Sequence, residues 1–334
     1  MQIFDAVRKY KVEINDSMIF SELTETNEEN LKEKKIIEKI NISKSSFHKT
    51  IEYFQKLGFS ISFSKSKGIK ILKKEPRLSP PEFFNYCPEK FRNNYHYFTT
   101  LNSTHEYAVR LIKNEPINES LIVAEYQSSG RGRSGRKWFS KLGSGILVSI
   151  ILDLSNIKSE DFSMLPIALS LSVAKTINSN LSWPNDIVVN DKKIGGTLIS
   201  NFIKGDKKHA VLSLGLNVFG SGDEVSPALK QATTMHQEGM IEKGWKNPRA
   251  TILKNWINNL DKEIKNISNK DKLFKEWSSL LVDKGKKIFW IDIHGKKFYG
   301  EFIEGSQNGN AFVRDVDGNE FEIKAEETPF YSFK

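Results

Sequence analysis

The chain has 334 residues, of which 38% are hydrophobic, and it carries a formal net charge of +9. This length exceeds one typical hydrophobic core and predicts two or three domains. No apolar run approaches the roughly 18 residues of a membrane-spanning helix, and the first ten residues lack the apolar core of a signal peptide. We therefore expect a cytoplasmic protein that does not contact a membrane. Cys87 is the only cysteine, which excludes an intrachain disulfide and a cysteine-based zinc site.

The positive charge is concentrated near the start of the chain, since residues 40–79 contain nine Lys or Arg against two Glu. Their pattern predicts a short helix over 34–40, a second helix that Ser43 caps and Gly58 ends, and two strands within 59–72 joined by a basic turn. This order is typical of a winged helix-turn-helix. We assign residues 1–75 to such a domain, which includes an N-terminal extension.

The second helix and the turn of this domain carry side chains able to meet DNA: Lys44, Ser45, His48, Lys49, Lys65 and Lys67. Because charge and topology coincide, we favour DNA binding. The alternative is a winged domain that serves as a protein-contact module with solubilising lysines.

Residues 76–94 are expected to be a linker, because Pro76, Pro80, Pro81 and Pro88 interrupt any helix. Beyond it, helices are predicted over 103–113, 164–179 and 248–266. Apolar runs at 121–124 and 145–152 have the length and composition of strands. Together they predict a mixed sheet flanked by helices, which we assign to residues 95–283.

A glycine- and arginine-rich loop joins these two strands. It reads Gln127-Ser-Ser-Gly-Arg-Gly-Arg-Ser-Gly-Arg-Lys-Trp138. Glycines let successive backbone N–H groups converge, and guanidinium groups match phosphate or carboxylate oxygens, so the pattern indicates an anion-binding loop. A solvated surface turn and a nucleic-acid tether remain open on this motif alone.

A second motif, Ser182-Trp-Pro-Asn-Asp followed by Lys193 and two glycines, predicts a hairpin with a tight turn at 190–191. Taken singly, Lys193 is a turn lysine and Asp186 a turn cap. Near the end of the chain, short alternating strands over 287–293, 297–303, 311–315 and 320–323 predict a small SH3-like barrel, which we assign to residues 284–334.

The two motifs in this order closely resemble those of the biotin protein ligases, and Asn102-Ser103-Thr104 and Leu214 to Val218 resemble further segments of that family. The order of domains resembles the bifunctional ligase–repressors. The resemblance implies an α+β protein with a class II synthetase-like catalytic domain between the winged helix-turn-helix and the barrel. It also implies a two-step reaction, in which biotin and ATP form biotinyl-5′-AMP and biotin then passes to a lysine of a biotin carboxyl carrier protein.

The chemistry independently accounts for the residue types. Joining a carboxylate to a phosphate requires fixed positive charge, which Arg133 and Lys193 supply, and the incoming lysine amine needs a carboxylate such as Asp186 to take its proton. These are the expected catalytic residues. The expected binding residues for biotin and its adenylate are Ser103, Thr104, Gln127, Gly130, Arg131, Gly132, Arg133, Trp138, Asn185, Lys193, Gly195, Gly196 and Asn217. Mg²⁺ is expected with ATP, without a metal site built from protein ligands alone.

One position departs from the family. Ser182 stands where most members carry a lysine, so a cation near the phosphates is missing unless Lys192 replaces it. The alternative function is therefore a biotin-sensing DNA-binding regulator with weak or no turnover. A lipoate or octanoate transferase fits less well, because the polar groups near Ser103 and Gln127 suit a ureido ring. The partners implied are biotin, ATP, the carrier protein, operator DNA and a ligand-promoted second copy of the chain.

Overall fold

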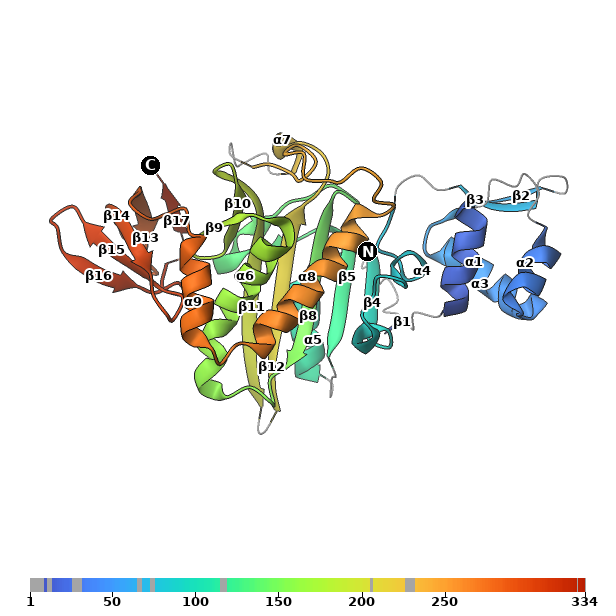
Figure 1. The fold of residues 1–334 in the computed structure, drawn as a ribbon, viewed down its shortest axis with the longest axis horizontal. Coiled ribbons are helices and arrows are strands. Elements are labelled where there is room, and N and C mark those ends of the chain that lie inside the picture. Colours follow the sequence, from blue (N-terminus) through green and yellow to red (C-terminus); the bar gives the residue numbers. More distant parts are fainter. Residues whose placement is uncertain are drawn as a thin grey trace.

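We describe the protein from a computed structural model that covers residues 9–10, 14–25, 32–64, 68–72, 76–114, 119–204, 207–225, 232–328 and 330–333. Three regions follow one another along the longest axis (Figure 1). Helices and a hairpin from the N-terminal part lie at one end, a large sheet lies in the middle, and a smaller sheet from the C-terminal part lies at the other end. Within the described residues, we find no helix with the length and apolarity required to cross a membrane.

The N-terminal region contains three helices and a hairpin: α1 (Ile14–Glu25), α2 (Glu33–Ile40), α3 (Lys44–Lys56), β2 (Ser60–Ser64) and β3 (Gly68–Leu72). The predicted helices and strands are confirmed. Ser43 Oγ accepts a hydrogen bond from the amide of Ser46, and Gly58 has a φ of 82° just after α3. Helix α1 was not predicted, although its Phe20 packs on Phe54 and Phe59 in the core of this region.

The central sheet has eight strands, in the order β1-β4-β5-β8-β12-β11-β10-β9. Only the β4–β5 pair is parallel, so the predicted mixed sheet is confirmed. In chain order the strands are β1 (Lys9–Tyr10), β4 (Tyr95–Leu101), β5 (Ser120–Gln127), β8 (Gly145–Asp153), β9 (Asn180–Ser182), β10 (Asp186–Val189), β11 (Lys192–Lys204) and β12 (Lys207–Asn217).

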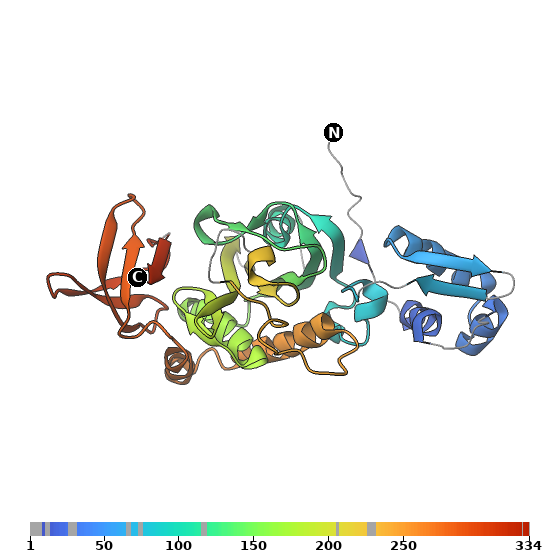
Figure 2. The same ribbon diagram turned by 90° about the horizontal axis from the view of Figure 1, so that it is seen from above.

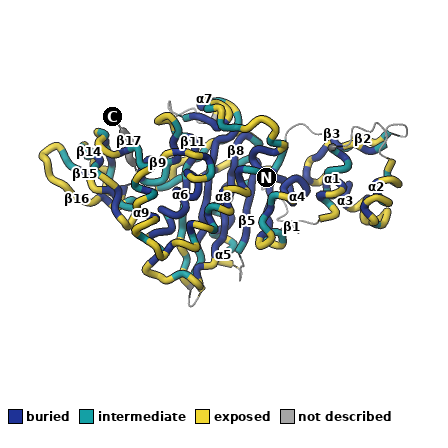
Figure 3. Tube along the Cα trace, in the orientation of Figure 1, coloured by how far each residue is buried: buried dark blue, intermediate teal, exposed yellow. Residues whose placement is uncertain are grey.

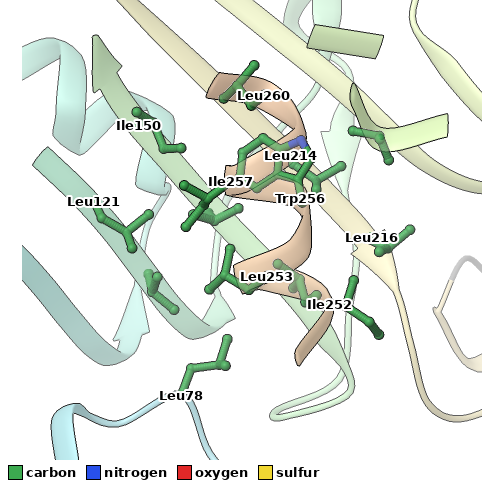
Figure 4. Packing of buried hydrophobic residues seen from close by; sticks show 14 of the residues in the cluster. Leu78, Leu121, Ile150, Leu214, Leu216, Ile252, Leu253, Trp256, Ile257 and Leu260 are labelled. Atoms are coloured by element: carbon green, nitrogen blue, oxygen red, sulfur yellow. The ribbon is translucent and has the colours of Figure 1, made fainter. Parts of the chain in front are cut away.

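Helices cover both faces of this sheet (Figure 2). On one face lie α6 (Leu165–Ile177), which follows the 3-10 helix η3 (Ser159–Met164), and α8 (Pro248–Lys265). The buried face of α8 carries Leu253, Trp256, Ile257 and Leu260, which meet the apolar side chains of the strands (Figure 4). Burying each such side chain contributes about 1.5–3 kcal/mol. Helix α5 (Thr104–Asn114) packs on the other face. Figure 3 shows that buried residues are concentrated in the sheet and in α6 and α8.

The expected linker is structured and largely buried. Pro80 and Pro81 begin the short helix α4 (Pro80–Phe83), and a 3-10 turn η1 (Glu89–Phe91) follows. The expectation that these prolines interrupt a helix was wrong, because proline is favourable in the first helical turn, where its missing N–H has no partner to lose. Leu78, Phe83 and Phe91 are fully buried, so this segment belongs to the core.

The C-terminal region is a five-stranded antiparallel sheet in the order β16-β15-β14-β13-β17. Its strands are β13 (Lys287–Ile291), β14 (Lys297–Gly305), β15 (Ala311–Asp315), β16 (Glu320–Ile323) and β17 (Phe330–Phe333). The four predicted strands are confirmed, and β17 is additional. Helix α9 (Lys270–Ser279), which precedes this region, was also not predicted.

Candidate functional site

A cavity of about 440 Å³ opens on the central sheet beside α5. Most of the residues predicted from sequence line it: Ser103, Thr104, Gln127, Arg131, Gly132, Arg133, Trp138, Asn185, Asp186, Lys193, Gly196 and Asn217. They come from α5, from β5, β10, β11 and β12, and from the loop between β5 and β8. Tertiary structure thus gathers motifs that are far apart in the chain, and the volume is in the range of small-molecule sites.

The glycine-rich loop folds into a miniature hairpin of β6 (Gly130–Arg131) and β7 (Lys137–Trp138) around the 3-10 turn η2 (Arg133–Gly135). Gly130 does not line the cavity. Its role is steric, because a Cβ there would lie 2.7 Å from the carbonyl oxygen of Trp138. Gly215 on β12, which was not among the predicted site residues, has a similar role: a Cβ there would lie 2.7 Å from the Trp138 ring. The two glycines therefore allow Trp138 to lie against the sheet.

The predicted hairpin places the lysine and the aspartate side by side. Strands β10 and β11 are joined at Asn190 and Asp191, which have φ values of 51° and 59°. Lys193 Nζ lies 2.6 Å from Asp186 Oδ1, and both side chains are partly exposed to the cavity. Gly195 faces away, and a Cβ there would lie 2.9 Å from the carbonyl oxygen of Gly215 on the neighbouring strand. It is therefore required by sheet packing.

Arg133 provides the second cation of this side of the cavity. Burial, followed by the nearby charge of Arg136, lowers the pKa of Arg133 to about 10, so the guanidinium stays charged at neutral pH. Its Nη2 donates a hydrogen bond to the carbonyl oxygen of Ala325 in the C-terminal region. Arg131 is exposed and pairs with Glu106 at 2.8 Å.

Ser182, the position that departs from the family pattern, is hydrogen-bonded to Asp283. Ser182 is buried and donates a hydrogen bond to Asp283 Oδ1 at 3.0 Å, while the amide of Trp183 donates to Asp283 Oδ2 at 2.9 Å. Lys192, considered as a replacement cation, is not among the residues that line the cavity, and it lies 3.7 Å from Glu238. The lysine of the family is therefore not replaced by Lys192.

Another part of the cavity lining is neutral and hydrogen-bonded. The amide and the hydroxyl of Thr104 both donate to Gln127 Oε1, at 2.7 and 3.1 Å. Ser103 Oγ accepts from the amide of Glu106 at 3.3 Å, so Ser103 caps α5 as well as lining the cavity. His105, the next residue of α5, also lines the cavity and was missed by the sequence reasoning.

Three polar atoms at the cavity are buried and have no hydrogen-bond partner in the described part of the chain: Arg133 Nη1, Trp138 Nε1 and Asn185 Oδ1. Two are donors and one is an acceptor. Buried polar groups in folded proteins nearly always have partners, so these three groups are exceptions, and they belong to residues that line the cavity.

The segment after β12 closes one end of the cavity. Asn217 Nδ2 donates to the carbonyl of Thr233 at 3.2 Å, and Ala232 pairs with Lys193 in an isolated bridge. Residues 219–221 lead into the short helix α7 (Gly222–Val225), where Glu224 pairs with Lys141 at 2.7 Å. The following residues, 226–231, lie outside the described part of the chain.

The residues predicted to bind DNA lie far from this cavity, in the N-terminal region (Figure 1). Lys44, Ser45, His48 and Lys49 are exposed on α3. Glu33 of α2 lies 2.9 Å from His48 Nε2 and 3.7 Å from Lys44 Nζ, so part of this positive charge is locally balanced. Lys65 and Lys67 lie outside the described residues.

The chain is similar to known proteins in the part that forms the central sheet. Residues 97–217, which contain both motifs, match the biotin/lipoate A/B protein ligase family. The bifunctional ligase/repressor BirA of Bacillus spizizenii is 30% identical over 216 residues, a match that covers 63% of this chain and 66% of the relative; BirA of Bacillus subtilis matches to the same extent. The chain thus spans slightly less than two thirds of the length of these relatives. The solved biotin protein ligase from Aquifex aeolicus in complex with biotin and ATP aligns with a TM-score of 0.57 and 25% identity, covering 72% of this chain and 99% of that one.

Proposed function

We propose, because residues 97–217 match the biotin/lipoate A/B protein ligase family, that the protein is an ATP-dependent biotin–protein ligase. In this proposal the cavity binds biotin and ATP, forms biotinyl-5′-AMP, and delivers biotin to a lysine of a biotin carboxyl carrier protein. The observation that carries the proposal is that one cavity brings together Lys193, Asp186 and Arg133 of the two motifs with Thr104 and Gln127.

The division of the cavity suits the first step. Biotin has a neutral ureido ring and a carboxylate, and the carboxylate must approach the negatively charged α-phosphate of ATP. Thr104 and Gln127 meet the neutral ring, whereas Lys193 and Arg133 stabilise the charge that develops where the carboxylate attacks the phosphorus. Because Lys193 is held 2.6 Å from Asp186, its ammonium group is oriented before the ligands bind.

Asp186 and Asn217 complete the proposed mechanism. In the second step the amine of the carrier lysine loses a proton as it attacks the acyl carbon of the adenylate, releasing AMP, and the Asp186 carboxylate accepts that proton. Mg²⁺ bound together with ATP would neutralise phosphate charge. Asp186 and Asn217 offer the oxygen ligands that this ion prefers, and the phosphates supply the others.

Phe139 is a candidate for contacting the adenine ring. It lines the cavity, 49% of its side chain is exposed, and it directly follows the glycine-rich loop. An exposed aromatic ring at a cavity rim can stack on a base. The segment 219–224 then acts as a lid that orders over the nucleotide.

The experiment follows radiolabelled biotin into a purified carrier domain with MgATP, using the wild-type protein, Lys193→Ala and Lys192→Ala. The two lysines are neighbours on β11, but only Lys193 lines the cavity. We expect Lys193→Ala to lower single-turnover adenylate formation by about 100–1,000-fold and Lys192→Ala to leave it unchanged. Equal rates in the two variants would remove Lys193 from the mechanism. Tight biotin binding without transfer by the wild-type chain would favour the biotin-sensing regulator.

A second function, repression through DNA binding, is proposed for residues 1–75 as a winged helix-turn-helix. It is supported by the exposed basic face of α3 and by the names of the BirA relatives. Operator DNA and a ligand-promoted homodimer are its proposed partners. Residues 76–94 would connect it, as a largely buried segment, to the ligase domain at 95–283, and residues 284–334 would form an SH3-like domain. Lys49→Ala should weaken operator retention in a gel-shift assay, while Lys254→Ala on α8 should not. Equal retention by both would exclude α3 as the DNA-contacting helix.

A further inference from the structure

A chain of hydrogen bonds runs beneath the neutral side of the cavity and uses residues to which the proposed mechanism gives no role. It begins at Ser200 on β11 and passes through His105 of α5, Ser213 on β12 and Ser149 on β8 before it reaches Thr104 and Gln127. The successive distances are 3.0, 2.8, 2.7, 2.9 and 3.1 Å. Thr104, Ser149 and Ser213 are at most 7% exposed, so water competes little for these bonds.

The donor at each step follows from counting protons, starting at Gln127. The backbone amide of Thr104 can only donate, so the Gln127 atom that it meets at 2.7 Å must be the amide oxygen. That oxygen only accepts, which means that the Thr104 hydroxyl also donates its proton to it. Because a hydroxyl has one proton, Thr104 Oγ1 must accept from Ser149.

The same argument continues away from Gln127. Ser149 has used its proton on Thr104, so its oxygen accepts from Ser213. Ser213 has then used its own proton, and its oxygen must accept from His105 Nδ1. His105 therefore carries a proton on Nδ1, and all the bonds from His105 to Gln127 have one direction.

The end of the hydrogen-bond chain at His105 and Ser200 is consistent with these donor directions. Burial lowers the pKa of His105 to about 4, although the charge of Glu106 opposes the shift, so the ring is neutral at pH 7. A neutral ring with a proton on Nδ1 has an unprotonated Nε2, which accepts from the Ser200 hydroxyl at 3.0 Å. Each hydroxyl of the hydrogen-bond chain thus donates one hydrogen bond, and no two donors face each other.

We infer that this one-directional chain positions Thr104 and Gln127 to recognise a ligand group that offers both an N–H donor and a carbonyl acceptor, as a cyclic urea does. With its oxygen committed to Thr104, Gln127 directs its amide N–H groups elsewhere. The Nε2 atom of Gln127 lies 3.1 Å from the position that a Cβ on Gly130 would occupy. Within the described residues, this nitrogen donates to no protein atom. Thr104 Oγ1 has a second lone pair that accepts but no proton left to donate.

His105, Ser213 and Ser149 are therefore positioning residues, which act on the ligand through Thr104 and Gln127. The identity of the ligand rests on the proposed function, since biotin supplies the urea, but the direction of the chain does not. Removing one inner hydroxyl takes away the donor that holds the Thr104 hydroxyl in place, so Thr104 and Gln127 lose part of their fixed orientation toward the ligand.

The first test determines the tautomer of His105 in the full-length wild-type protein without ligands. Two-dimensional ¹⁵N–¹H spectra at pH 7 distinguish protonated from unprotonated ring nitrogens, and His105→Asn identifies the signals. We expect a neutral ring protonated on Nδ1. A ring protonated on Nε2 alone, or on both nitrogens, would overturn the inference, whatever reaction the protein catalyses.

The second test measures biotin affinity calorimetrically and the steady-state constants for both substrates in Ser149→Ala, His105→Leu and His105→Asn. Loss of one well-placed buried hydrogen bond costs about 1.4 kcal/mol, so Ser149→Ala and His105→Leu should raise the Kd of biotin about tenfold. The KM for ATP and kcat should change less than twofold. Asparagine offers an N–H near the position of Nδ1, so His105→Asn should regain most of the affinity.

The matched control is Ser170→Ala, because Ser170 is buried in α6 and bonds only to backbone carbonyls of its own helix. It should leave biotin affinity unchanged. Unchanged affinity in Ser149→Ala, an equal loss for ATP, or His105→Asn as weak as His105→Leu would each overturn the inference. Failure of the wild-type chain to form biotinyl-5′-AMP would contradict the proposed function instead, and the tautomer result would stand apart from it.

Discussion

The two ends of the chain attach to the central sheet in different places and by different interactions. The N-terminal region is connected through a buried ion pair, in which Arg249 Nη1 lies 2.6 Å from Glu125 Oε2 and Nη2 donates to the carbonyl of Pro76 at 2.7 Å. Glu125 also accepts from the amide of Leu78 at 2.7 Å. None of these residues is among those that line the cavity.

The C-terminal region instead contacts residues of the cavity itself. Asp283, at the boundary with this region, accepts hydrogen bonds from Ser182 and Trp183, and within the region the carbonyl of Gly309 accepts from Trp183 Nε1 at 2.9 Å. Arg133 donates to the carbonyl of Ala325. The C-terminal region thus contacts residues that form the cavity, whereas the N-terminal region is joined to the sheet away from the cavity.

Because of this difference, similar polar contacts are expected to affect different properties of the protein at the two junctions. A change at the N-terminal junction should alter folding and the placement of α3 but spare the chemistry. A change at the C-terminal junction should alter both.

The largest effect is expected from Arg249→Met. Both partners of the pair are at most 3% exposed, and removal of one leaves the Glu125 charge buried and unpaired, which costs about 3–5 kcal/mol. Chemical denaturation should show that loss, while kcat/KM for adenylate formation changes less than threefold in the folded protein. Arg314→Met, which breaks a partly exposed pair, should cost about 1 kcal/mol or less. A large loss of kcat/KM in Arg249→Met would break the comparison.

Asp283→Ala should affect both stability and chemistry. It removes a fully buried acceptor from two donors, for a loss of about 3 kcal/mol in the free energy of unfolding. Because the donors belong to the turn that positions Asn185 and Asp186, adenylate formation should fall about tenfold or more. Asp292→Ala is the control, since Asp292 accepts from two amides in an exposed turn of the same region. Full activity of Asp283→Ala would place the C-terminal region outside the site.

The pH dependence of the free energy of unfolding reports on the core of the central region, which lies between the two junctions. The folded-state pKa of His105 is about 4, against 6.5 for the unfolded chain, because burial disfavours the charged ring. Between these values the unfolded chain binds more protons, so stability decreases as pH falls from 6.5 toward 4, by at most about 3 kcal/mol. His105→Asn should remove that part of the slope. An unchanged slope would show that other groups produce it.

Arg77→Ala should have the smallest effect. Its guanidinium donates to the carbonyl of Leu57 at 2.9 Å and lies 5.1 Å from the Phe59 ring centroid, which joins the linker to the N-terminal region. Losing both should cost about 1–2 kcal/mol. We expect local hydrogen exchange in residues 57–72 to increase, while the exchange of β11 and β12 stays unchanged. Faster exchange in those two strands would mean that this junction is coupled to the site.

Much of the architecture could be predicted because local sequence specifies it. Helix α3, the hairpin of β10 and β11, and strands β13 to β16 each carry their own pattern of apolar spacing, caps and turn residues. Helix α1 and strand β17 were missed. Helix α1 follows an unassigned N-terminal segment and has a weak apolar periodicity, and it is ordered by the packing of Phe20 on Phe54 and Phe59. Its stability therefore comes from residues more than thirty positions away in the sequence.

By itself the sequence determined the kinds of groups available to the site: the glycines and arginines of one loop, the lysine and aspartate of one hairpin, and a serine in place of a lysine. Each follows from short-range pattern, because turn geometry and strand alternation act over a few residues. Only the tertiary structure decided which groups meet. The serines of β8, β11 and β12 line up behind His105 because sheet register sets those neighbours, and no local pattern encodes a register between distant strands. Ser182 meets Asp283, which lies in a turn about a hundred residues further along the chain.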